Sequence, residues 1–263
     1  MRRVMCFPCA GDTLFGTLDT PDNGAPGKTG LLIVSGGNEI RIGAHRGMAL
    51  LAQRLAARGI PVFRFDRRGI GESTGSNGGF LSSGPDIGGA AATFSAEAGI
   101  ERLVAFGNCD AATALALFGS TAGIDRLILA NPWIVEPTDD LPPAAAIRSR
   151  YVEKLKDPRE LWRLVSGGVN IAKLAKGLTR VSLPRTEPNE LALRLTTALS
   201  GWQDRATILL AGGDATAIAY RDAITRTGLT LPTVTRDTPS HSFAREGDAG
   251  WLEERIVEAL GHG

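Results

Sequence analysis

The chain has 263 residues, 43% of them hydrophobic and 22% charged, which is the composition of a globular protein with a full core. Its formal net charge of +1 gives no overall attraction to nucleic acid or to an anionic membrane. Three cysteines cannot form a disulfide framework and favour a reducing compartment. No apolar run of signal-peptide length follows the first residues, and we find no run of about twenty apolar residues that could cross a bilayer. We therefore expect a soluble, cytoplasmic protein without an integral membrane span and without nucleic acid as a partner.

Short apolar runs alternate with helical patterns along the chain. This alternation is typical of an α/β fold, in which a mostly parallel central sheet is flanked by helices on both faces. Period and composition predict an N-terminal hairpin and six further strands, at residues 3–8, 13–18, 31–34, 62–65, 103–106, 127–129, 207–210 and 233–235. Helical spacing is found at residues 46–58, 110–119, 215–226 and 249–260.

Residues 133–200 break this alternation, because helical stretches follow one another there without a strand between them. We expect this segment to be a helical cap insertion above the carboxyl ends of the strands, while 1–132 and 201–263 form the core. Ten Lys and Arg stand against three acids over 143–185. This excess is compatible with a solvated helical face, with an anionic substrate or with contact to a membrane surface.

The segment Gly107-Asn108-Cys109-Asp110-Ala111 follows the strand at 103–106 and begins a helix of small residues. A strand, a sharp turn and a helix with small residues on both sides of the central one form the nucleophile elbow of α/β-hydrolases, G-x-S-x-G. Here Cys replaces Ser, and Ala replaces the last Gly. The amides at a helix N-terminus favour a thiolate, whereas the charge of Asp110 opposes one. The alternative role for Cys109 is that of a small buried core residue.

Two further residues follow strands in the order that α/β-hydrolases use, which is nucleophile, acid and histidine. Asp214 comes after the strand at 207–210, and His241 comes after the last strand. Asp214 is also suited to cap the helix that follows it, and both roles can coexist. His45 is the alternative base. We expect Cys109 to be the nucleophile, His241 the base and Asp214 the acid that orients it.

The remaining site residues are assigned from their places beside these groups. The backbone N–H groups of Asp110 and Gly37 are expected to form the oxyanion hole, because Gly37 lies in the turn after the strand at 31–34. We assign Asn38, Asn108 and Trp133 to substrate binding.

No metal or cofactor is expected. Cys6-Phe7-Pro8-Cys9 lacks a second pair of metal ligands, and Gly69-Ile70-Gly71 lacks the third glycine of a dinucleotide fingerprint.

The segment Asp66-Arg67-Arg68-Gly69-Ile70-Gly71-Glu72-Ser73 resembles the D-x-R-G-x-G-x-S signature of α/β-hydrolases. More narrowly, nearly the whole chain resembles the exosortase A system-associated hydrolase 1 family. Four segments carry this resemblance: Gly36 to Arg46, Gly107 to Ala112, Tyr151 to Gly167, and Gly212 to Ala217.

This resemblance implies a hydrolase associated with bacterial exopolysaccharide and exosortase loci, with no agreed substrate. It also implies Cys109, Asp214 and His241 as the catalytic residues. Asn108 and Ser242 depart from the residues expected after the elbow glycine and after the histidine, which leaves the pocket shape open.

Together these residues predict cleavage of an ester, thioester or lactone of a small-molecule acyl substrate, through an acyl-enzyme on Cys109. A thiol nucleophile favours such activated acyl groups over amides. Two alternatives stay open. The acyl group could pass to an alcohol or sugar acceptor, or the chain could be a non-catalytic accessory binding protein that keeps the fold.

Overall fold

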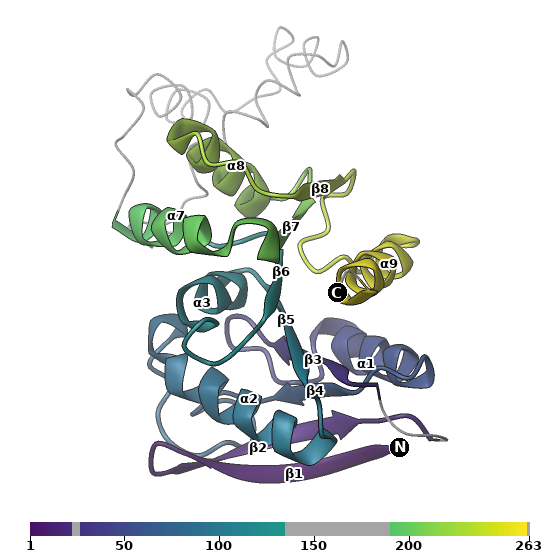
Figure 1. The fold of residues 1–263 in the computed structure, drawn as a ribbon. Coiled ribbons are helices and arrows are strands. Elements are labelled where there is room, and N and C mark those ends of the chain that lie inside the picture. Colours follow the sequence, from purple (N-terminus) through teal and green to yellow (C-terminus); the bar gives the residue numbers. More distant parts are fainter. Residues whose placement is uncertain (23–26, 135–189, 262–263) are drawn as a thin grey trace, which may run out of the picture.

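The computed structural model describes residues 1–22, 27–134 and 190–261. Within them, eight strands form one sheet in the order β1-β2-β4-β3-β5-β6-β7-β8 (Figure 1). The strands are β1 (Arg2–Cys9), β2 (Asp12–Asp19), β3 (Thr29–Val34), β4 (Val62–Phe65), β5 (Arg102–Asn108), β6 (Arg126–Ala130), β7 (Ala206–Ala211) and β8 (Thr233–Arg236). β1 and β2 form the predicted antiparallel hairpin, and β2 runs antiparallel to β4. From β4 to β8 every pairing is parallel.

Helices cover both faces of this sheet. They are α1 (Gly47–Ala57), α2 (Gly84–Ala98), α3 (Asp110–Phe118), α7 (Glu190–Trp202), α8 (Ala215–Thr227) and α9 (Asp248–Gly261), with short 3-10 helices η1 (Ala44–Arg46), η2 (Phe80–Ser82) and η3 (Gln203–Arg205). One buried cluster joins the sheet to α2, α3, α7 and α8, and a second joins its other face to α1 and α9. The predicted fold class, a mostly parallel central sheet flanked by helices, is confirmed.

Helix α2 was not among the predicted elements. Its sequence contains Gly88 and Gly89, which lower intrinsic helix propensity. Packing outweighs that cost, because Ile87, Ala90 and Phe94 lie on one side of the helix and are buried against the sheet. The helix is therefore stabilised mainly by its tertiary contacts.

The predicted cap insertion, 133–200, lies mostly outside the described residues, so it stays a prediction. Its last part is described and belongs to α7, which packs beside α3 through Leu195 and Leu199, both fully buried. Helix α7 extends from Glu190 to Trp202, across the predicted boundary at residue 200, and that boundary stays a prediction. In the described part of the chain, no helix combines the length and apolar character needed to cross a bilayer.

The core contains a buried ion pair. Arg64, in the middle of β4, is 2% exposed, and its Nη2 lies 2.9 Å from Oδ2 of Asp19. Arg64 also donates to the carbonyl of Arg41 at 2.8 Å. The pair fixes β2 against β4, and removing Asp19 would leave the Arg64 charge buried without its carboxylate partner.

Candidate active site

Cys109 lies in the tight turn between β5 and α3. Its φ of 63° and ψ of −126° are uncommon for a residue other than glycine. The turn is tied to the end of β6, because the Cys109 amide donates to the Ala130 carbonyl at 2.9 Å and the Cys109 carbonyl accepts from the Trp133 amide at 3.1 Å. The backbone thus has the strand–turn–helix geometry that the elbow motif predicts.

The small residues around this turn are required by close packing. A Cβ at Gly107 would lie 2.9 Å from the carbonyl carbon of Ala111 and 2.9 Å from Cδ1 of Leu115. A Cβ at Gly36 would lie 2.7 Å from the Asn108 carbonyl oxygen. Ala111 itself is fully buried. Strand β5, the first turn of α3 and the loop after β3 therefore meet with no room for larger side chains.

His241 and Asp214 come together, although they follow different strands. The Nδ1 atom of His241 lies 3.1 Å from Oδ2 of Asp214. The same carboxylate caps α8, since it accepts from the amides of Thr216 at 3.0 Å and Ala217 at 3.1 Å. Asp214 therefore combines the contact with His241 and the capping role, and the cap fixes the carboxylate that faces the imidazole.

Cys109 is the second residue that acts on the pKa of the His241 imidazole. The hydrogen bond with Asp214 and then that with Cys109 raise the pKa of His241 from 6.5 to about 10, against the opposing effect of burial. Burial raises the pKa of Asp214, but the hydrogen bond and charge of His241 and the two capping amides outweigh it, so the pKa lies below its ordinary value. The carboxylate is thus ionised, and the imidazole is a stronger base than a free histidine.

The two amides expected to form an oxyanion hole differ in their surroundings. The Asp110 amide lies in the first turn of α3, where helical N–H groups have no partner within the helix. The Gly37 amide donates to Oδ1 of Asp110 at 2.7 Å. The Gly37 carbonyl accepts a hydrogen bond from the buried Arg67 guanidinium. Gly37 is thus held between an anion and a cation, and its amide is engaged in this structure.

The residues assigned to substrate binding lie at three places around the elbow. Asn38 is exposed, and its Oδ1 accepts from Nδ2 of Asn77 at 2.9 Å. Trp133 is half-buried, and its carbonyl accepts from the Thr113 hydroxyl at 2.6 Å. Asn108 is half-buried, and its Nδ2 donates to the His241 carbonyl at 3.2 Å. The Asn108 amide is therefore engaged with the protein itself, and all three substrate-binding assignments stay predictions.

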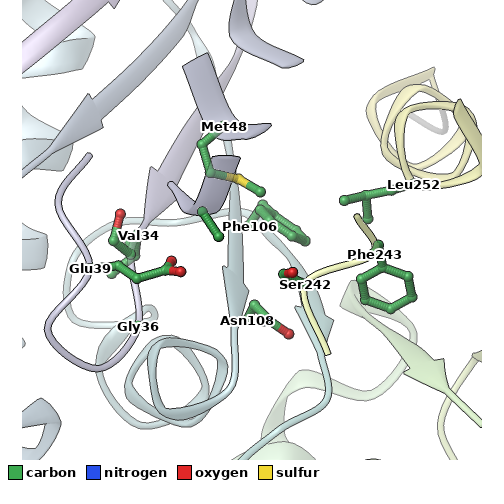
Figure 2. Close-up of a pocket in the computed structure, with 11 residues that line it drawn as sticks. Val34, Gly36, Glu39, Met48, Phe106, Asn108, Ser242, Phe243 and Leu252 are labelled. Atoms are coloured by element: carbon green, nitrogen blue, oxygen red, sulfur yellow. The ribbon is translucent and has the colours of Figure 1, made fainter. Parts of the chain in front are cut away.

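A pocket lies beside the elbow, between the loop after β3, the start of α1, the end of β5, the segment after His241 and α9 (Figure 2). Apolar side chains form much of its wall, while Asn108, Ser242 and the carboxylate of Glu39 supply polar groups. The lining residues are Val34, Ser35, Gly36, Glu39, Ala44, Met48, Phe106, Asn108, Ser242, Phe243 and Leu252. The pocket reaches Asn108 and Ser242, the residues that precede Cys109 and follow His241.

Sequence reasoning missed one residue of this region. Asn131, which follows β6, is fully buried. Its Nδ2 donates to the His241 carbonyl at 3.0 Å and to Oδ1 of Asn108 at 3.1 Å, and its Oδ1 accepts from the Ala211 amide at 2.8 Å. The available signal was its position at the carboxyl end of a central strand, where α/β proteins place their site residues.

Solved structures of several α/β-hydrolases are similar to this chain over nearly its full length. An alpha-beta serine hydrolase homologue from Coxiella burnetii is 13% identical, with a TM-score of 0.64 and coverage of 98% of this chain and 97% of that one. An esterase from Pyrococcus furiosus is 15% identical, with a TM-score of 0.65 and coverage of 99% and 90%. An alpha/beta hydrolase from Penicillium sp. sh18 is 16% identical, with a TM-score of 0.64 and coverage of 99% and 98%.

No protein-family model and no curated protein matches the sequence. The narrower resemblance to the exosortase A system-associated hydrolase 1 family therefore stays a prediction. Identities of this size establish the architecture and leave the chemistry to the site. The sheet order, the flanking helices and the solved relatives agree that the chain has the α/β-hydrolase fold.

Proposed function

We propose that the protein is a hydrolase that cleaves an ester, thioester or lactone through an acyl-enzyme on Cys109. The observation that carries this proposal is the His241 imidazole, which lies 3.1 Å from the Asp214 carboxylate and whose pKa is raised by Asp214 and then by the elbow residue Cys109. A nucleophile beside a base that a third group orients is the arrangement used for covalent acyl transfer.

In the proposed reaction, His241 takes the proton of Cys109, and the raised pKa of the imidazole favours this transfer. The thiolate attacks the acyl carbonyl and forms a carbon–sulfur bond, which leaves a negative charge on the carbonyl oxygen. Collapse of this intermediate expels the alcohol or thiol, which receives its proton from His241. His241 then deprotonates water, the hydroxide attacks the acyl-enzyme, and the carboxylic acid leaves as Cys109 regains its proton.

The negative charge on the carbonyl oxygen needs N–H donors that are free to bind it. The Asp110 amide is the first such donor in our proposal. The Gly37 amide can serve as the second only after the Asp110 carboxylate releases it, because a carboxylate at that place would repel the oxyanion. Rotation of the Asp110 side chain is therefore part of the proposed cycle, and the substrate carbonyl competes with it for Gly37.

The pocket beside the elbow is small, so we expect it to take a small apolar group of the substrate, which Met48, Phe106 and Leu252 would contact. Glu39 disfavours an anionic group in this pocket, since two negative charges would share it. The basic segment at 143–185, which prompted the expectation of an anionic substrate, lies outside the described residues. The exopolysaccharide context rests on the sequence resemblance alone.

The proposal can be tested with a carbonyl-type electrophilic probe followed by peptide mass mapping. Cys109 should be labelled selectively in the wild type. Labelling should fall in His241→Ala and persist in His45→Ala, which removes an exposed histidine as the matched control. The exposed Cys6 serves as the internal reference. Equal labelling of Cys6 and Cys109 that does not depend on His241 would contradict the proposal and favour the accessory-protein alternative.

A panel of 4-nitrophenyl esters and acyl thioesters then tests turnover. Cys109→Ala should abolish hydrolysis of any ester that the wild type cleaves, and full activity in this variant would exclude the acyl-enzyme mechanism. Adding alcohols or sugars to the assay separates the acyltransferase alternative. A rise in turnover that depends on the acceptor, with an acylated acceptor as product, would favour transfer over hydrolysis.

A further inference from the structure

We propose that Asn131 is a positioning residue that sets the place of His241 relative to Cys109 and Asp214. The inference deepens the proposed function and rests on it, because it assigns the means by which the base reaches its nucleophile. The hydrogen bonds of the Asn131 side chain run to the Asn108 side chain, the His241 carbonyl and the Ala211 amide, and not to the thiol or the imidazole. It acts through the segment that carries the histidine.

The hydrogen bonds of Asn131 reach three segments, each of which carries one member of the proposed triad. Nδ2 of Asn131 donates to the His241 carbonyl at 3.0 Å. Its second proton goes to Oδ1 of Asn108, the residue before Cys109, at 3.1 Å. Oδ1 of Asn131 accepts at 2.8 Å from the amide of Ala211, which ends β7 shortly before Asp214. One side chain therefore connects the three segments at the carboxyl edge of the sheet.

The orientation of this amide group is fixed by its partners. The Ala211 amide can only donate, so it requires the Asn131 oxygen, and the two carbonyl oxygens require the Asn131 nitrogen. The side chain is fully buried, and exchanging its nitrogen and oxygen would place two donors together at the Ala211 amide and two acceptors together at the His241 carbonyl and at Asn108 Oδ1. Its backbone φ of 42° lies in the left-handed region, which Asn and Asp tolerate best among residues other than glycine.

A second amide acts on the same carbonyl. Asn108 donates from Nδ2 to the His241 carbonyl at 3.2 Å while accepting from Asn131. The carbonyl of His241 is thus held by two donors on one side, while Asp214 holds its ring at 3.1 Å. With both the backbone and the ring fixed, the imidazole has little freedom to turn away from the thiol. Displacing a catalytic group by about 1 Å can lower the rate roughly 10²-fold.

The variant Asn131→Asp gives a sharp test, because it keeps the size of the side chain and its tolerance of a positive φ. An oxygen then replaces the nitrogen that faces the His241 carbonyl, so attraction becomes repulsion. Trp202→Phe is the matched control. It removes another buried side-chain N–H, which donates to the Ala116 carbonyl at 3.0 Å, without touching the His241 segment. Asn108→Ala is the second variant, should Asn131→Asp fail to fold.

The deciding measurement is the imidazole 1H–15N NMR spectrum of the full chain. The chain has three histidines, and His241→Gln identifies the signals of His241. Asn131→Asp and Asn108→Ala should shift these signals and leave those of His45 and His262 in place, whereas Trp202→Phe should leave all three unchanged. With an ester that the wild type cleaves, kcat of Asn131→Asp should fall roughly 10²-fold while KM changes by less than about twofold.

Unchanged His241 signals in both asparagine variants would overturn the inference, even if those variants were less stable. A rise in KM with kcat preserved would overturn it as well, because that result would place Asn131 in substrate binding. Failure of the proposed function is seen separately, as wild-type protein without His241-dependent labelling of Cys109. The His241 spectrum decides the role of Asn131 whichever way that labelling turns out.

Discussion

Replacing Gly107 by alanine tests whether the close packing of the elbow is required. The new Cβ would lie 2.9 Å from the carbonyl carbon of Ala111 and 3.0 Å from its oxygen. Both atoms belong to the backbone of α3, which cannot yield as a flexible side chain would. Overpacking of this kind costs about 1–3 kcal/mol, so we expect Gly107→Ala to lower the free energy of unfolding by that amount.

Gly88→Ala is the matched control with the opposite sign. Gly88 lies inside α2, its Cβ would meet no atom within 4 Å, and its backbone does not require glycine. Alanine is favoured over glycine inside a helix by about 0.5–1 kcal/mol. The same chemical change should therefore stabilise the protein at residue 88 and destabilise it at residue 107.

Urea denaturation at equilibrium measures both changes, provided that the dependence of the free energy on denaturant is unaltered. Labelling of Cys109 should also fall in Gly107→Ala under conditions where the variant is still folded, because a shift of α3 moves the elbow. The reasoning is refuted if Gly107→Ala is as stable as the wild type, or if both variants change stability in the same direction.

Three further predictions follow from buried and titrating groups. The pKa of His241 is raised from 6.5 to about 10, so the stability it contributes is complete below about pH 6.5 and is lost as the pH rises through about 10. The difference in unfolding free energy between wild type and His241→Gln should shrink over that range, and a constant difference would contradict this. Burial raises the pKa of Cys9 to about 11, so iodoacetamide at pH 8 should modify Cys9 only after unfolding, and rapid modification in the native protein would be evidence against it. Asp19→Asn should cost about 3–5 kcal/mol by leaving Arg64 without its buried partner, whereas the exposed Asp22→Asn should have little effect; equal costs would rule out a special role for the buried pair.

Much of the fold could be read from the sequence, because continuous apolar runs and helical spacing are local signals. Every predicted strand is present, including the hairpin that begins the sheet. Helix α2 was missed because its glycines hide a period that becomes clear only when Ile87, Ala90 and Phe94 pack on the sheet. The division into core and cap stays a prediction, because residues 135–189 lie outside the described part of the chain.

The candidate site was partly predictable for a different reason. Parallel strands bring their carboxyl ends to one edge, so Cys109, Asp214 and His241 could be grouped from their positions after strands. Two features depend on side-chain direction and could not be foreseen. One is the Asp110 carboxylate on the Gly37 amide, and the other is the amide network of Asn131. In both cases the side chain binds another part of the site, whereas its position in the sequence would equally suit a loop residue or a residue that contacts substrate.

The strand order has a consequence for when this site can arise during synthesis. Strands β3 to β6, with the elbow between β5 and α3, are translated well before β7 and β8, which extend the sheet in order from β6 to its edge. At roughly 5–20 residues per second, the ribosome needs several seconds to pass from Cys109 to Asp214. A nascent chain can thus form the turn that holds the thiol while the acid and the base are still missing. The proposed reactivity would therefore appear only when the last two strands have joined the sheet.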